Sequence, residues 1–111
     1  MNNLMTINGQ QAAISFDPEI NLFRGEFVGL ANGGADFYAA DVDGLRREGE
    51  ISLHVYLDMC REDGVNPFRA FSGKFNVRVP PALHAACTAA AVSSGKSLNQ
   101  WITETLEAAA A

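Results

Sequence analysis

The chain has 111 residues and a formal net charge of −5, with 48% hydrophobic and 19% charged residues. That length allows one domain, or one small domain with an appendage of about 40 residues. No apolar run approaches the ~20 residues that span a bilayer, and the first residues lack the basic and apolar parts of a signal peptide. Two cysteines and two histidines, none at the spacing of zinc ligands, exclude a structural zinc module. We therefore expect a cytoplasmic protein with no metal and no cofactor.

The first half of the chain is predicted to contain three strands. Residues 12–16 alternate between apolar and polar side chains, which is the period of a half-buried strand. Turn-forming residues at 17–21 separate this segment from a second strand at 22–28. Asn32-Gly33-Gly34 marks another reversal, because these residues adopt positive φ at little cost, and the third strand follows at 36–39.

One helix is predicted after the strands. Asp41 or Asp43 can cap its N-terminus, and Gly64 fits its C-terminal end. Gly49 is expected to weaken the helix by about 1 kcal/mol relative to alanine. The apolar residues on one face are Leu45, Leu53, Tyr56, Leu57 and Cys60. The result is a β-β-β-α unit, a sheet covered by one helix.

The last 40 residues show a separate pattern of one strand and two helices. Residues 74–79 alternate strictly between two faces. One face carries Phe75, Val77 and Val79, and the other carries Lys74, Asn76 and Arg78. Pro80-Pro81 stops the strand and starts a helix that ends near Ser94-Gly95. A second helix begins at Ser97 through a capping box with Gln100.

The strand at 74–79 needs a second copy of the chain, because the tail offers no other strand to pair with. Its unpaired backbone groups would be costly to bury, and fragments this small seldom hold a core alone. Two copies can pair antiparallel across a two-fold axis, with four helices covering the apolar face. The expected dimer core comprises Phe75, Val77, Val79, Leu83, Leu98, Trp101 and Ile102.

The polar face of such a two-stranded ribbon fits the major groove of B-DNA. There arginine can pair with guanine, asparagine with adenine, and lysine with guanine or phosphate. The N-terminus of the last helix suits a DNA phosphate, because it offers free backbone amides. The predicted DNA-binding residues are Lys74, Asn76, Arg78, Lys96 and Ser97. The alternative is an ordinary dimerisation strand whose outer face is only polar.

Charge is distributed unevenly along the chain. Residues 1–71 carry five basic and eleven acidic side chains, a net charge of −6, whereas residues 72–111 carry three basic and two acidic ones, a net charge of +1. Two interpretations remain open: the two parts have different partners, or the negative charge only keeps a small domain soluble.

Two segments of the tail, residues 72–84 and 94–101, carry a resemblance to a known family. Ser72-Gly73-Lys74-Phe75-Asn76-Val77-Arg78-Val79-Pro80-Pro81-Ala82-Leu83-His84, followed by Ser94-Gly95-Lys96-Ser97-Leu98-Asn99-Gln100-Trp101, resembles the ribbon-helix-helix tail of the HicB antitoxin family. The first half is similar to that family's N-terminal domain, a partial RNase-H-like unit. The resemblance implies an α+β fold with a toxin-binding domain at 1–66, a linker at 67–73 and a ribbon-helix-helix DNA-binding and dimerisation domain at 74–111.

The resemblance further implies a non-enzymatic antitoxin of a type II toxin–antitoxin system. Such a protein neutralises a small basic mRNA-cleaving toxin of the HicA type and represses its own operon by binding operator DNA. It would act as a homodimer or a higher oligomer, without a membrane partner. The alternative is a solitary ribbon-helix-helix regulator that has no toxin partner.

A third hypothesis is a metal-dependent nuclease, because an RNase-H-like sheet can hold Mg²⁺ on clustered carboxylates. Asp17 and Asp36 are the only plausible pair, and both stand where turn-forming aspartates are common. Gly95-Lys96-Ser97 is not a phosphate-binding P-loop, because Ala90 stands where that motif requires its first glycine. His54 and His84 are more typical of surface or half-buried histidines than of catalytic ones.

Overall fold

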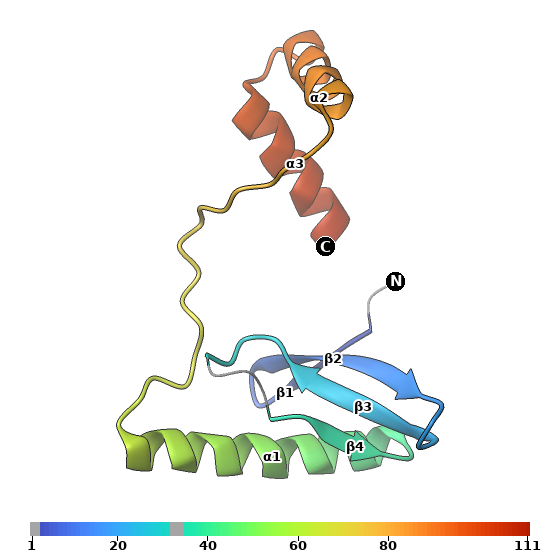
Figure 1. The fold of residues 1–111 in the computed structure, drawn as a ribbon, viewed down its shortest axis with the longest axis vertical. Helices are drawn as coiled ribbons and strands as arrows, with labels where there is room; N and C mark the ends of the chain where they lie inside the picture. Colours follow the sequence, from blue (N-terminus) through green and yellow to red (C-terminus); the bar gives the residue numbers. More distant parts are fainter. Residues whose placement is uncertain (1–2, 32–34) are drawn as a thin grey trace. The chain divides into compact units, whose positions relative to one another are not determined.

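The computed structural model describes residues 3–31 and 35–111 of the chain. Two compact units are present, Met1–Ser72 and Gly73–Ala111. The first holds a sheet and one helix, and the second holds two helices, so the fold class is α+β as predicted (Figure 1). The predicted reversal at Asn32-Gly33-Gly34 lies outside the described residues.

The sheet of the first unit has four strands, where the sequence predicted three. They are β1 (Leu4–Ile7), β2 (Gln10–Asp17), β3 (Leu22–Phe27) and β4 (Phe37–Ala39), each antiparallel to the next in this order. The missing strand, β1, is joined to β2 by Asn8 and Gly9, whose φ angles are 48° and 82°. Two residues with positive φ form the tight turn that matches the twist of a hairpin. The prediction overlooked β1 because its four residues do not alternate in polarity.

One face of the sheet carries the apolar side chains that alternate along each strand. Ala12, Ile14 and Phe16 of β2 stand opposite Phe27, Gly25 and Phe23 of β3. Ala12 and Phe27 are buried, whereas Phe16, at the other end of β2, is 52% exposed. This face of the sheet is therefore covered more fully at the end of Ala12 and Phe27 than at the end of Phe16.

The helix that covers this face, α1, spans Val42–Asp63. Asp41 caps it as predicted, since its Oδ1 accepts a hydrogen bond from the Gly44 amide at 2.6 Å. Gly64 ends it in the left-handed conformation, with φ 68°. The predicted apolar face is also confirmed. Leu45, Leu53 and Cys60 are buried, and Tyr56 and Leu57 pack against the core.

Two glycines allow the helix and the sheet to come close together. A Cβ at Gly49 of α1 would lie 2.3 Å from Cδ1 of Ile7 and 3.1 Å from the Phe37 ring. A Cβ at Gly25 of β3 would lie 2.1 Å from the same ring. The sequence predicted Gly49 only as a cost to helix stability. Its lack of a side chain is what lets α1 approach β1 and β4.

The chain leaving α1 is anchored to the first unit. The Ala31 amide donates to the Pro67 carbonyl at 2.9 Å, and the Arg69 amide donates to the Gly29 carbonyl at 2.9 Å. The Tyr56 hydroxyl also donates to the Pro67 carbonyl, at 2.8 Å. Residues 67–69, which the resemblance implied to be linker, are thus hydrogen-bonded to residues 29–31 and to α1.

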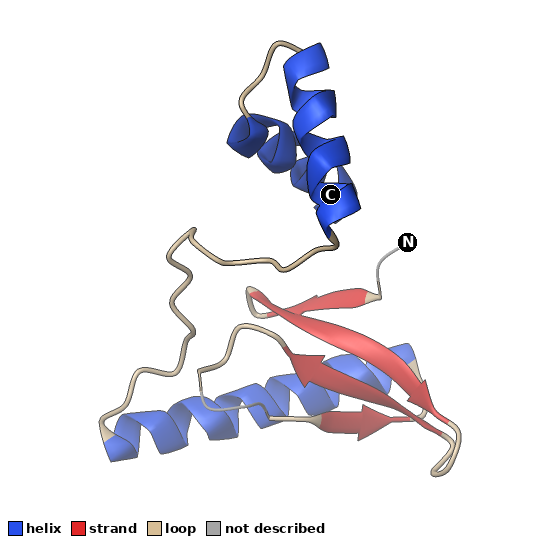
Figure 2. Cartoon of the chain, turned by 45° about the horizontal axis from the view of Figure 1, so that its top comes forward, coloured by secondary structure: helices blue, strands red, loops and turns tan. Residues whose placement is uncertain are grey.

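The second unit contains the two predicted helices, α2 (Pro81–Ser93) and α3 (Leu98–Ala110). They are joined by a tight turn in which Gly95 has φ 69°. Residues 74–79, predicted as a strand, are neither strand nor helix in the single chain, where Figure 2 draws them as loop. A strand needs a neighbour to share its hydrogen bonds, and these residues have no strand partner among the described ones.

In the described residues, no helix combines the length and apolar character needed to cross a membrane. The 22 residues of α1 are long enough, but nine of them are charged.

We expect Gly25→Ala to destabilise the first unit, because the added methyl group would overlap the buried ring of Phe37. Overpacking of this kind costs about 1–3 kcal/mol of unfolding free energy. Urea unfolding of the full chain, followed by circular dichroism, measures the effect. Gly29→Ala is the matched control, because a Cβ there would meet only the flexible Gln10 side chain, at 3.1 Å. Equal midpoints for the two variants would contradict the packing described.

Candidate nucleic-acid interface and apolar groove

The alternating segment at 74–79 is open to solvent on both faces. Phe75 is 73% exposed and Val77 is 69% exposed, and Val79 is also exposed. Lys74, Asn76 and Arg78, the predicted base-reading residues, are exposed as well. The segment therefore presents apolar and polar side chains in alternation, with neither set covered by its own chain.

The two helices beside it have almost no core of their own. Among the described residues of the second unit, Ala91 alone is buried. Of the predicted dimer-core residues on the helices, Leu98 and Trp101 are half-buried, whereas Leu83 and Ile102 are exposed. The apolar side chains of α3 are thus only partly covered by the second unit itself.

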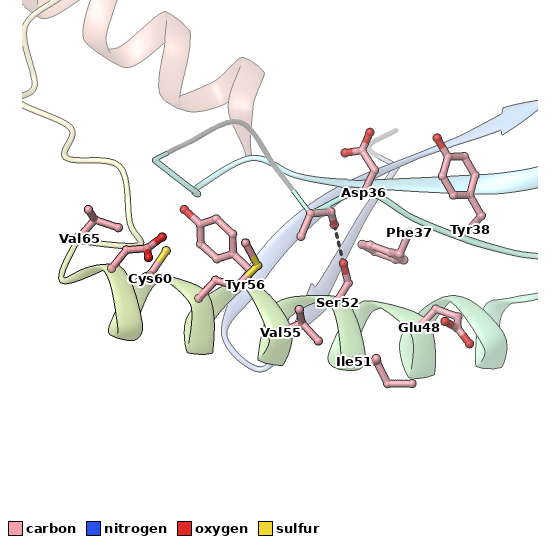
Figure 3. A pocket seen from close by; sticks show the side chains of 13 residues that line it. Asp36, Phe37, Tyr38, Glu48, Ile51, Ser52, Val55, Tyr56, Cys60 and Val65 are labelled. Carbon is pink, nitrogen blue, oxygen red and sulfur yellow. Dashed lines mark hydrogen bonds between the residues drawn. The ribbon is translucent and has the colours of Figure 1, made fainter.

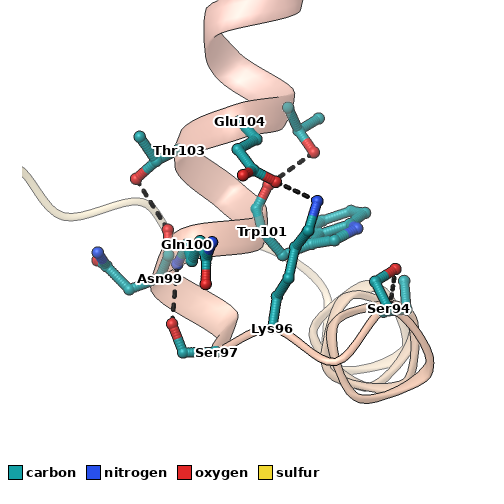
Figure 4. Close-up of polar contacts among 10 residues, drawn as sticks. Ser94, Lys96, Ser97, Asn99, Gln100, Trp101, Thr103 and Glu104 are labelled. Atoms are coloured by element: carbon teal, nitrogen blue, oxygen red, sulfur yellow. Dashed lines mark hydrogen bonds and ion pairs between the residues drawn. The ribbon is translucent and has the colours of Figure 1, made fainter.

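Ser97 uses its hydroxyl to cap α3, as predicted. Its Oγ accepts a hydrogen bond from the Gln100 amide at 3.1 Å (Figure 4). The first amides of the helix and its positive dipole end lie directly after this residue, which is the geometry that suits an anion. Ser97 therefore orients the helix terminus at which a phosphate contact was predicted.

Lys96, the other predicted phosphate contact, is paired within its own unit. Its Nζ forms an ion pair with the Glu104 carboxylate on α3 (Figure 4). The hydrogen bond from Lys96 lowers the pKa of Glu104; desolvation opposes this, and the lysine charge and a hydrogen bond with Gln100 add to it. The sequence analysis missed Glu104, because its position eight residues after Lys96 follows no simple helical spacing across the start of α3.

The first unit has an open groove between α1 and β4, with a volume of about 960 Å³. Phe37 and Tyr56 lie toward its inner side, and Ser52 crosses it to donate a hydrogen bond to the Ala35 carbonyl at 3.1 Å (Figure 3). Ile51, Val55 and Met59 line it from one side of α1 and are 54%, 51% and 57% exposed.

No feature of this groove was identified from the sequence. The helical pattern was read only for the face of Leu45 and Leu53, although Ile51, Val55 and Met59 form a second stripe at spacing four. That stripe is the signal that could have found it. A smaller hollow of about 400 Å³ has a separate lining that includes Phe16, Phe23 and Val42.

Asp17, one carboxylate of the nuclease hypothesis, ends β2 opposite Leu22 of β3, whereas Asp36, the other, directly precedes β4. Asp17 accepts a hydrogen bond from the Glu19 amide at 3.0 Å, and Asp36 accepts one from Nε of Arg24 at 3.1 Å. Phe37, the residue after Asp36, pairs with Gly25, so two strand spacings, about 10 Å, and several residues along the strands separate the two carboxylates. Asp36 also raises the pKa of Arg24, through the hydrogen bond and its charge. In the part of the chain that the structure describes, no three histidine, cysteine or acidic side chains group as metal ligands.

The family comparison matches residues 56–106 to the model of the HicB family. Just under half of the chain is thus similar to the HicB family. The HicB match runs from the second half of α1 through the alternating segment to α3, so it includes all five predicted DNA-binding residues. The match associates the chain with toxin–antitoxin systems. No curated protein and no solved structure matches the chain.

We expect the pKa of Glu104 to lie below its usual value and to rise in Lys96→Met, because that variant removes both the hydrogen bond and the charge. A depressed pKa means that the pair stabilises the folded chain above the usual glutamate pKa. That contribution is lost as the pH falls through the lower, folded value. A carbon-detected NMR titration of the carboxyl group measures both pKa values. An unchanged pKa in the variant would show that the pair does not form.

Proposed function

We propose that the chain is a HicB-type antitoxin with two binding activities and no catalytic one. Residues 74–79 dimerise and bind operator DNA, and the first unit neutralises a small basic mRNA-cleaving toxin of the HicA type. The observation that carries this proposal is the exposed, alternating segment at 74–79, beside two helices that bury a single residue of their own. Both activities place the protein in the cytoplasm, where operators and messenger RNA are found.

The apolar side chains of the second unit support dimerisation. Phe75 and Val77 stand in solvent, and each such side chain gains about 1.5–3 kcal/mol when it is fully buried. Pairing with the same segment of a second chain satisfies the backbone groups of residues 74–79 and brings both apolar faces together under four helices. The half-buried Trp101 then completes its burial against the partner.

The polar side chains of the same segment support DNA binding. In the paired ribbon, Lys74, Asn76 and Arg78 occur twice on one face, and a two-stranded ribbon of this kind enters the major groove. The N-terminus of α3, which Ser97 caps, can bind a phosphate beside it, because the first amides of a helix lack acceptors within the helix. To contact a phosphate, Lys96 would give up its ion pair with Glu104.

The charge of the first unit supports toxin binding. Residues 1–71 carry a net charge of −6, and complementary charge speeds the encounter with a basic protein and excludes partners of the same sign.

A solitary regulator is the second candidate, and one observation favours it. The family match begins at residue 56, so the four strands and the first half of α1 lie outside it. A first unit that differs from those of the family could serve another partner. A small basic reading frame beside this gene favours the antitoxin, and an isolated gene favours the regulator.

We expect Val77→Lys to convert the chain from a dimer to a monomer, because a charge at this position cannot be buried in the paired ribbon. Sedimentation velocity at micromolar concentration measures the mass. Asn76→Ala is the matched control, because it changes the neighbouring residue on the opposite face and should leave the dimer intact. A monomeric wild-type chain would overturn the proposed ribbon.

We expect Arg78→Ala to weaken binding to the operator by about 1–3 kcal/mol, the cost of one lost base contact. Titrations at fixed salt on the operator and on unrelated DNA measure the loss, which should be larger on the operator. Unchanged operator affinity would remove Arg78 from the base-reading residues.

The same Arg78→Ala variant should still neutralise the toxin in a growth-rescue assay, because the substitution lies outside the first unit. Loss of rescue by this variant would show that toxin and DNA use the same surface.

A further inference from the structure

The groove between α1 and β4 has the form of a docking surface for a helix. Ile51, Val55 and Met59 follow one another at a spacing of four residues, which makes a continuous apolar ridge on the helix surface. Ridges of this kind pack into the grooves of another helix. Eight residue steps separate Ile51 from Met59, or about 12 Å at 1.5 Å per residue, so the ridge matches two to three turns of a partner helix.

A helix fits this surface better than an added strand does. The outer strand beside the groove, β4, has three residues, Phe37–Ala39. A strand that pairs with it would gain few backbone hydrogen bonds. The ridge, in contrast, offers three large apolar side chains that are each more than half exposed.

The charged side chains around the groove indicate the sign of the charge on the partner. The described residues that line it include Asp36, Glu48 and Asp63, whose side chains are carboxylates, and no lysine, arginine or histidine. Asp36 is paired with Arg24, whereas Glu48 and Asp63 form no ion pair with any of the described residues. A second copy of this unit would bring the same negative charges to the contact, so the charge disfavours self-association here.

We propose that this groove is the surface that holds the toxin, by receiving an amphipathic helix with apolar residues toward Ile51, Val55 and Met59 and basic residues toward Glu48 and Asp63. This inference rests on the proposed antitoxin function and names the contact by which it acts.

The apolar contact is tested by Val55→Lys in the full-length chain. The probe is a catalytically inactive toxin of the HicA type, and calorimetry measures its affinity. We expect Val55→Lys to weaken binding by about tenfold or more, as for a residue at the centre of an interface. Val42→Lys is the matched control: Val42 lies on the same helix and is 60% exposed, but it lines the smaller hollow. It should change the affinity by less than about twofold.

The charged contact is tested by comparing two reversals on α1. Glu48→Lys and Glu50→Lys change the net charge equally, but only Glu48 lines the groove. We expect Glu48→Lys to weaken toxin binding several-fold more than Glu50→Lys. Equal effects would show that only the overall charge of the unit matters. Thermal unfolding followed by circular dichroism confirms that each variant is folded, as expected for exposed positions.

The possible outcomes distinguish an error in the proposed groove from an error in the proposed antitoxin function. If the wild-type chain binds the toxin and Val55→Lys binds it equally well, the proposed docking in the groove is wrong, but the antitoxin function stands. Failure of the wild-type chain to bind the toxin would overturn the antitoxin function itself. If Val55→Lys instead reduces the oligomeric state of the chain and leaves toxin binding intact, the occupant is a second copy, and the proposal is wrong.

Discussion

A β-strand shares its backbone hydrogen bonds with a neighbour, and this constraint governs the second unit of the chain. Residues 74–79 have the side-chain alternation of a strand but no strand partner among the described residues. The two helices that follow them bury Ala91 and little else. A segment of this kind is incomplete as a monomer, because it has no neighbouring strand among the described residues and its apolar side chains Phe75 and Val77 remain in solvent. The proposed dimer and the proposed DNA contacts both depend on which strand pairs with residues 74–79.

The parts of the fold that follow local rules could be predicted from the sequence. The caps at Asp41, Gly64 and Ser97 act through side chains or backbone angles within a few residues, and each is present. The tail helices follow from proline, glycine and apolar spacing for the same reason. Strand β1 was missed because its polarity does not alternate, although Asn8-Gly9 is a strong hairpin signal.

The parts that depend on tertiary packing could not be predicted. The close packing that Gly49 allows depends on Ile7 and Phe37, which lie elsewhere in the chain. The groove depends on which side of α1 the sheet leaves open, and helical spacing alone does not show where a sheet ends. The pairing of Lys96 with Glu104 depends on the path of the turn before α3. Of the candidate sites, the alternating segment was therefore visible in the sequence, and the groove was not.

The hydrogen bonds of residues 67–69 to residues 29–31 have a consequence for how the two proposed activities are linked. They leave four residues, 70–73, between the anchored chain and the start of the alternating segment. Five steps join Arg69 to Lys74, so at about 3.5 Å per step this tether reaches no more than about 18 Å. A toxin held by the first unit would stay close to operator DNA held by its own dimer, at an effective concentration on the order of millimolar. In the proposed complex, the short tether would let the basic charge of a bound toxin add to the attraction for DNA.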